Sequence, residues 1–205
     1  MKILKIAVTG SAGSGKSLVC QRLKEKGLVT LDCDVIARQV VAPGMPGFKK
    51  IVELFGERVV LEDGSLDRSA LRNIIVHDSQ MRKKMEDILH PQILIEMVSQ
   101  MENAGYEGKK KAVAVEVPLL FESGMDEQFD ITIAVTANDP DLVNRISNRN
   151  KVTKNNAQKM LDLQMAQEEK IKRADYSILN KGTRSELFES VDNLFDKILK
   201  EFLTI

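Results

Sequence analysis

The chain has only two cysteines, no excess charge of either sign and no long apolar run, and each absence excludes a class of protein. Cys20 and Cys33 are too few for a disulfide framework or a cysteine metal site, so we expect buried, reduced thiols. Lysine plus arginine and aspartate plus glutamate both number 30, which leaves no net positive field for nucleic acid. The longest apolar run, residues 112–121, is interrupted by Glu116 and Pro118 and is too short to cross a bilayer.

The beginning of the chain also lacks the pattern of a secretory signal. The first residues lead directly into a strand-like run at 3–9. A length of 205 residues fits one domain with an inserted region and is enough to bury a large core. We therefore expect a cytoplasmic protein without a membrane or nucleic-acid partner. The sequence does not determine the oligomeric state, and a monomer is our expectation.

Residues 10–17 read G-S-A-G-S-G-K-S, which matches the complete pattern G-x-x-x-x-G-K-[ST] of a phosphate-binding loop. The loop follows the strand-like run and precedes a helix-compatible stretch at 18–24. Glycines let backbone N–H groups turn toward a phosphate, and the helix adds its positive N-terminal end. Lys16 can reach the β- and γ-phosphates, and the Ser17 hydroxyl can bind Mg²⁺. The motif therefore predicts a site for a nucleoside triphosphate.

Strand-like and helix-like segments alternate along much of the chain, which predicts an α/β fold with a mainly parallel sheet. Residues 35–105 instead lose strand character and show helical periodicity, which predicts a mostly helical insertion. The expected strands are 3–9, 28–31, 112–117, 131–135 and 176–179, and the expected helices are 16–26, 48–55, 69–76, 80–101, 139–150, 154–173 and 185–202.

Two carboxylates, Asp32 and Asp34, follow the second expected strand. Ligands of open parallel sheets bind outside the carboxyl ends of the strands, so these side chains should lie on the same edge as the phosphate loop. If the strand continues to Asp34, both carboxylates point to one side, because strand residues two apart share a face. A carboxylate there can accept a proton from an attacking hydroxyl or help to hold Mg²⁺. Asp34 fits a helix N-cap equally well, and the spacing leaves both interpretations open.

Three further positions have ordinary structural explanations when each is considered alone. Arg145 fits a solvated helix residue, with Arg149 one turn further on the same face. His90 fits a structural histidine in a long helical pattern that we expect Pro91 to break locally. Asn180 fits a turn as well as it fits a ligand contact.

Taken together, the motifs closely resemble the dephospho-coenzyme A kinase family. The matching segments keep the family's order and spacing from the phosphate loop nearly to the C-terminus. Two departures are minor: Cys33 separates the two acids where the family usually has alanine, and Leu18 follows the loop serine where the family often has threonine. The segments are 9–17, 32–38, 89–91, 117–122, Arg145, Gln164, 174–176, Asn180 and Gly182.

The resemblance implies that ATP, accompanied by Mg²⁺, phosphorylates the ribose 3′-hydroxyl of dephospho-coenzyme A in the last step of coenzyme A synthesis. It implies that Asp34 is the general base and that Arg145, on a lid, neutralises charge on the transferred phosphoryl group together with Lys16. The implied ATP contacts are Ala12, Gly13, Ser14, Gly15, Lys16, Ser17, Leu18 and Asn180; the implied acceptor contacts are Asp34, Arg38, His90, Pro118 and Leu119; and the implied metal ligand is Ser17, with Asp32 in support.

The same resemblance implies one domain of the P-loop nucleoside triphosphate hydrolase type, with a parallel sheet flanked by helices. Its core is expected at about 1–34 and 110–205, its acceptor-binding helical insertion at 35–109 and its lid at 139–167. Two other functions share the phosphate loop: another small-metabolite kinase, of the nucleoside monophosphate or shikimate type, and a partner-driven ATPase module. A guanine-specific switch is disfavoured because residues 180–183, N-K-G-T, lack the acid of an [NT]-K-x-D motif.

Overall fold

The computed structural model describes residues 3–106 and 112–202. Contacts between residues divide the chain into two compact units. The sheet unit consists of Met1–Asp32 and Met101–Ile205, and the helical unit consists of Cys33–Gln100. The predicted boundary between insertion and core, at 109 and 110, falls outside the described residues.

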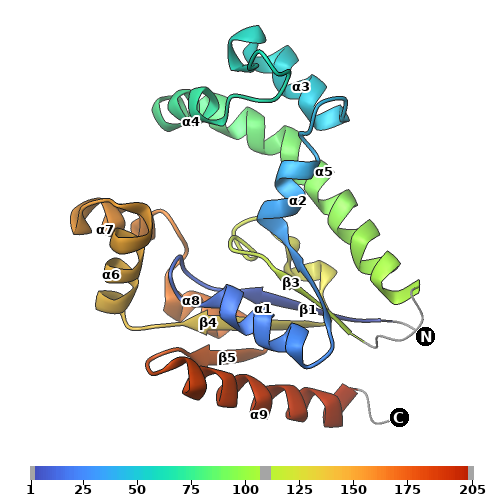
Figure 1. The fold of residues 1–205 in the computed structure, drawn as a ribbon, viewed down its shortest axis with the longest axis vertical. Helices are drawn as coiled ribbons and strands as arrows, with labels where there is room; N and C mark the ends of the chain where they lie inside the picture. Colours follow the sequence, from blue (N-terminus) through green and yellow to red (C-terminus); the bar gives the residue numbers. More distant parts are fainter. Residues whose placement is uncertain (1–2, 107–111, 203–205) are drawn as a thin grey trace. The chain divides into compact units, whose positions relative to one another are not determined.

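The sheet unit contains a parallel sheet, which confirms the predicted α/β architecture (Figure 1). Its described strands lie in the order β2-β3-β1-β4-β5, so β1 is central and the phosphate loop begins where this central strand ends. The bounds are β1 (Leu4–Thr9), β2 (Val29–Asp32), β3 (Ala112–Glu116), β4 (Ile131–Thr136) and β5 (Tyr176–Leu179).

Alternation along the strands builds the core of this unit. Every second residue of β1, such as Ile6 and Val8, points to one face of the sheet and is buried against α1 (Lys16–Glu25) and α9 (Arg184–Phe202). Helix α8 (Gln167–Arg173) contacts β4, and α6 (Asp139–Asn150) packs against α7 (Lys154–Asp162). A short 3₁₀ helix, η2 (Met125–Gln128), precedes β4.

The helical unit bears out the mostly helical character expected for this region. The buried apolar side chains of this unit include Ile51 of α3, Leu71 of α4 and Met97 of α5. The carboxylate of Asp67 caps the start of α4 by accepting from the backbone N–H groups of Ser69 and Ala70. The elements are α2 (Cys33–Gln39), α3 (Pro46–Phe55), η1 (Glu57–Val59), α4 (Arg68–His77) and α5 (Ser79–Tyr106), whose last turns belong to the sheet unit.

Three details differ from the sequence prediction. The helix expected over 154–173 is two helices, α7 and α8, separated by residues 163–166. Helix α5 continues through Pro91 instead of breaking there. The second strand ends at Asp32 and α2 begins at Cys33, so Asp34 lies in the first turn of a helix, and strand alternation does not pair it with Asp32.

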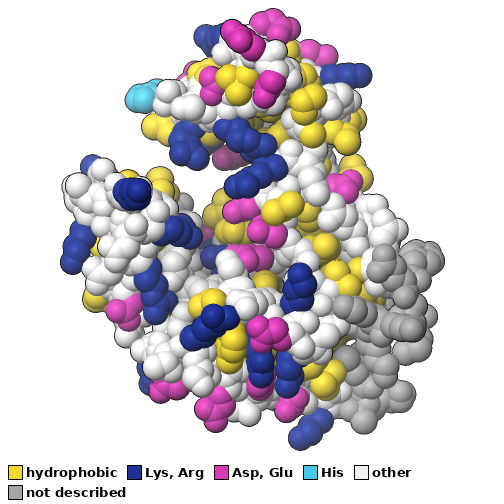
Figure 2. All heavy atoms as spheres, viewed as in Figure 1, with side chains coloured by type: hydrophobic (Ala, Val, Ile, Leu, Met, Phe, Trp, Pro, Cys, Tyr) yellow, Lys and Arg dark blue, Asp and Glu magenta, His cyan; other side chains and the backbone are white. Residues whose placement is uncertain are grey.

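The surface agrees with the balanced composition. On the face drawn in Figure 2, lysine and arginine side chains are interspersed with aspartate and glutamate side chains. Among residues 3–106 and 112–202, no helix combines the length and the apolar character needed to cross a membrane.

Candidate functional site

The phosphate loop leaves the central strand at Gly10 and enters α1 through Gly15. Both glycines have positive φ, 146° and 102°, a conformation that side chains disfavour. A Cβ atom on Gly10 would lie 2.0 Å from the backbone oxygen of Val135, so the loop passes too close to β4 for any other residue. Gly15 is the N-cap of α1, and the first N–H groups of that helix lack partners within the helix. The loop therefore presents the backbone donors that an anion needs.

Lys16 lies inside this loop rather than in solvent. Its ammonium donates to the backbone oxygens of Gly10, at 3.0 Å, and Ser11, at 3.1 Å, and the residue is 7% exposed. A cation held against the loop carbonyls adds positive charge where the backbone N–H groups already favour an anion. The structure thus places the Lys16 ammonium within the phosphate loop, and its contact with the β- and γ-phosphates stays a prediction.

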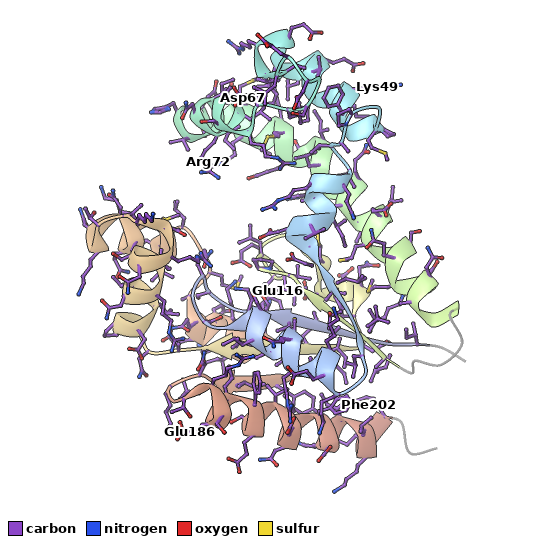
Figure 3. All side chains as sticks on the ribbon, viewed as in Figure 1. Lys49, Asp67, Arg72, Glu116, Glu186 and Phe202 are labelled. Atoms are coloured by element: carbon purple, nitrogen blue, oxygen red, sulfur yellow. The ribbon has the colours of Figure 1, made fainter. Side chains whose placement is uncertain are left out.

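A carboxylate that sequence reasoning did not single out contacts the loop serine. The Ser17 hydroxyl donates to Glu116 Oε1 at 3.0 Å, and Glu116 is the last residue of β3 (Figure 3). Asp32, at the end of β2, is the register partner of Glu116. One hydroxyl and two carboxylates therefore gather at the carboxyl edge of the sheet, where α/β proteins bind their ligands.

The Cys20 thiol is buried beside this pair of carboxylates. Burial raises the pKa of Cys20, and Glu116 and Asp32 raise it further because a thiolate would add a third negative charge. Lys16 opposes this effect without outweighing it. Neither Cys20 nor Cys33 forms a disulfide and both are buried, as the cysteine content predicts.

Asn180, which follows β5, contacts the backbone of the phosphate loop. Its side-chain amide nitrogen donates to the backbone oxygen of Ser14 at 2.7 Å, and the residue is 6% exposed. Its own backbone N–H donates to Thr136 at the end of β4. The same amide leaves no room for a side chain at Gly15, because a Cβ there would be 2.4 Å from it. The structure thus joins Asn180 to the phosphate loop through the loop backbone, whereas its contact with ATP stays a prediction.

Helix α6 brings an arginine to the loop. Arg145 Nη1 donates to the backbone oxygen of Gly13 at 3.1 Å. Arg149, one turn later, is exposed and donates to the side chain of Asn150. Of these two arginines, Arg145 is the one with a described contact to the phosphate loop.

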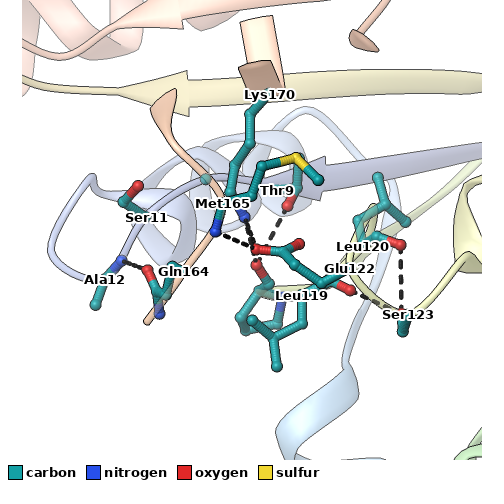
Figure 4. Close-up of polar contacts among 12 residues, drawn as sticks. Thr9, Ser11, Ala12, Leu119, Leu120, Glu122, Ser123, Gln164, Met165 and Lys170 are labelled. Carbon is teal, nitrogen blue, oxygen red and sulfur yellow. Dashed lines mark hydrogen bonds and ion pairs between the residues drawn. The ribbon is translucent and has the colours of Figure 1, made fainter. Parts of the chain in front are cut away.

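The segment after β3 contains two of the predicted acceptor residues. The backbone oxygen of Pro118 accepts from the Lys170 ammonium at 3.2 Å and from the Thr9 hydroxyl at 3.4 Å (Figure 4). Leu119 is 47% exposed, whereas its neighbour Leu120 is fully buried. The alternation leaves Leu119 accessible at the carboxyl edge of the sheet.

The remaining predicted site residues belong to the helical unit. Asp34 and Arg38 are exposed residues of α2, and His90 is an exposed residue of α5. This unit also has an apolar cavity of about 220 Å³, lined by side chains such as Ile51 and Leu71 and by the two arginines of α4, Arg68 and Arg72. The roles of Asp34, Arg38 and His90 toward an acceptor stay predictions.

Comparison with known proteins identifies the family of this chain. The chain matches the family model described as dephospho-CoA kinase over residues 4–186. A dephospho-CoA kinase from Bacillus cereus is 39% identical over 178 residues, which cover 87% of this chain and 88% of that protein. The solved structure of a dephospho-CoA kinase from Campylobacter jejuni is 27% identical with a TM-score of 0.73, covering 96% of this chain and 97% of that chain.

A more distant likeness extends to other kinases. A shikimate kinase from Acinetobacter baumannii reaches a TM-score of 0.58 at 19% identity, covering 99% of this chain and 97% of that chain, and this likeness shows the fold alone. The family match, in contrast, includes the phosphate loop, Glu116 at the end of β3, Arg145 of α6 and Asn180 after β5. The chain belongs to the dephospho-CoA kinase family.

Proposed function

We propose that this protein is a transferase that moves the γ-phosphoryl group of ATP to the ribose 3′-hydroxyl of dephospho-coenzyme A, the last step of coenzyme A synthesis. The observation that carries the proposal is the family match over residues 4–186, which includes a complete phosphate loop. The loop geometry supports it, because Lys16 and Arg145 place two cationic side chains on the backbone that would hold the phosphates.

The oxygen ligands at the sheet edge fit Mg²⁺. Magnesium prefers oxygen donors and is usually held by one or two carboxylates together with substrate phosphates. The Ser17 hydroxyl, Glu116 and Asp32 supply such a set. Among the described residues, no three His, Cys, Asp or Glu side chains gather closely enough to hold a metal ion on their own. When bound, the ion would neutralise phosphate charge.

The chain's own residues then divide the remaining tasks. Phosphoryl transfer is catalysed mainly by positioning and by electrostatic stabilisation, so the loop amides and Lys16 hold the phosphates while Arg145 stabilises charge on the transferred group. Asp34 accepts the proton of the 3′-hydroxyl. Arg38, His90, Pro118 and Leu119 contact the acceptor, and the apolar cavity of the helical unit, with its arginines, supports binding of a small molecule that has both apolar and anionic parts.

One experiment tests the proposal directly. The purified protein is incubated with ATP, Mg²⁺ and dephospho-coenzyme A, and mass spectrometry is used to detect one added phosphate and to locate it on the 3′-hydroxyl. Lys16→Ala protein is the matched control, since it lacks the ammonium within the loop. Product in the wild type but not in the control is expected. ATP hydrolysis without any phosphorylated acceptor would instead favour an ATPase module, and phosphorylation of shikimate or a nucleoside monophosphate would favour another kinase.

A further inference from the structure

A continuous set of polar contacts joins three segments of the sheet unit that lie far apart in the sequence (Figure 4). Gln164 Oε1 accepts from the backbone N–H of Ala12 in the phosphate loop at 3.0 Å. The next residue, Met165, donates its backbone N–H to Glu122 Oε1, also at 3.0 Å. The same carboxylate oxygen accepts from the Lys170 ammonium at 2.7 Å. The phosphate loop, the α7–α8 connection (residues 163–166) and the segment after β3 are thereby linked.

Burial of the Lys170 ammonium requires that these contacts stay intact. Its side chain is completely buried, and its described partners are the Glu122 carboxylate and the backbone oxygen of Pro118. A buried ammonium is costly unless an opposite charge and further acceptors surround it, so α8 can pack here only while Glu122 and Pro118 hold their positions. Burial tends to raise the pKa of Glu122, but hydrogen bonds from Lys170, its own backbone and Met165 hold that pKa below its usual value. Glu122 is thus a permanent anion at neutral pH.

The α7–α8 connection is also one end of the predicted lid. The other end of the lid, before α6, is joined to the start of α8. Gln167 accepts from the backbone N–H of Ala137 at 3.0 Å and donates to the backbone oxygen of Ala137 at 2.9 Å. Helices α6 and α7, which pack together between these two ends, contain Arg145. The position of the connection therefore bears on where Arg145 stands over the phosphate loop.

We propose that Glu122 and Gln164 are positioning residues for phosphoryl transfer. They hold the α7–α8 connection at a fixed position relative to the phosphate loop and to the segment after β3. Neither residue acts on the reacting atoms. Gln164 fixes the loop side through Ala12, and Glu122 fixes the acceptor side through Lys170 and Pro118. The inference rests on the proposed function, because the position of the α7–α8 connection matters only if both substrates meet at the carboxyl edge of the sheet. Small misplacements of reacting groups there slow phosphoryl transfer strongly.

Two substitutions and one control test the proposal. Glu122→Gln keeps the size of the side chain and removes its charge, while Gln164→Met keeps the length and removes the acceptor for Ala12. Asp192→Asn is the control, because it weakens an ion pair with Arg22 of 2.6 Å that joins α1 to α9 outside this network. At a temperature at which all proteins are folded, we expect kcat to fall about tenfold or more in both network variants, with KM for ATP within about threefold. The control should keep both constants within about twofold of the wild-type values.

A second readout does not depend on activity. Backbone amide exchange measured by NMR should quicken about fivefold or more at Met165 in the Glu122→Gln protein. Exchange should also quicken at Ala12, which Glu122 does not touch, if the contacts act as one unit. If Glu122→Gln does not fold because Lys170 loses its counter-charge, Gln164→Met supplies the same test from the other end, through exchange at Met165.

Two results would overturn the proposal. One is unchanged amide exchange at Ala12 in the Glu122→Gln protein, or at Met165 in the Gln164→Met protein. The other is a kcat within about twofold of the wild-type value in folded variants of Glu122 and Gln164. Failure of the proposed function is distinguishable from both. Wild-type protein that does not phosphorylate dephospho-coenzyme A would refute that function, whereas the exchange measurement would still decide whether the three segments are coupled.

Discussion

Replacing Asn180 by alanine distinguishes two roles of this residue: support of the phosphate loop, and the predicted direct contact with ATP, which would be made to its base. The buried amide donates to Ser14 at 2.7 Å and lies against Gly15, so its removal takes a hydrogen bond from a buried loop carbonyl. Such a loss costs about 1–3 kcal/mol of unfolding free energy. For a chain of this size, each kcal/mol lowers Tm by about 2–4 °C, which gives an expected decrease of about 2–12 °C.

The assay for Asn180→Ala combines thermal unfolding with nucleotide binding. If Asn180 holds the loop, affinities for ATP, GTP and inorganic triphosphate should fall by the same factor, because the loop binds the phosphates that all three share. Asn193→Ala, at an exposed position of α9, is the matched control and should change neither Tm nor affinity. A loss of affinity confined to ATP, with Tm unchanged, would refute the reasoning and assign Asn180 to the base.

Three other predictions address the remaining residues. Arg145→Ala removes the guanidinium that contacts Gly13, and kcat should fall about 10²-fold or more while KM for ATP changes little; a change in KM alone would make Arg145 a binding residue. Asp34→Asn removes the base, and turnover should fall about 10²–10⁴-fold. Its Tm should decrease only slightly, since an exposed acid in the first turn of a helix contributes about 0.3–1 kcal/mol; activity above about a tenth of wild type would show that the proton leaves by another route. The pKa of Glu122 is lower in the folded than in the unfolded protein, so its stabilisation is present at neutral pH and is lost as pH falls through the folded pKa. The Tm difference between wild type and Glu122→Gln should therefore shrink below about pH 4, and a difference that stays constant to pH 2 would contradict this assignment.

The sequence predicts the elements of the sheet unit well because their signals are local. Buried parallel strands appear as short apolar runs, and the phosphate loop is a contiguous motif. The division of the helix expected over 154–173 has no such signal. No glycine or proline stands at 163–166; the connection is held by Gln164 and by Glu122, whose partners are remote in the chain. Pro91 misleads in the opposite way, because α5 continues through it where local preference predicts a break.

Glu116 illustrates why part of the candidate site escapes sequence reasoning. It appears as one acid that interrupts an apolar run, and its partner Ser17 lies on another element. The usable signal is its position as the last residue of β3, since strands of a parallel sheet place their carboxyl ends at one edge. Asp32 and Asp34 show the converse, because their spacing suggests a shared face but the chain changes from strand to helix between them.

The central place of β1 in the sheet has a consequence for the order in which this protein folds. Although β1 is synthesised before the other described strands, Leu4 pairs with Ala112 and Ile6 pairs with Ile131, and β2 pairs with β3 instead of with β1. Such distant pairings form slowly, because the entropy of closing a long loop is lost before the contacts compensate for it. The phosphate loop follows β1 directly, but its described contacts include β4 and Asn180, which come much later in the chain, so this early part of the nucleotide site becomes ordered only after most of the chain has been made.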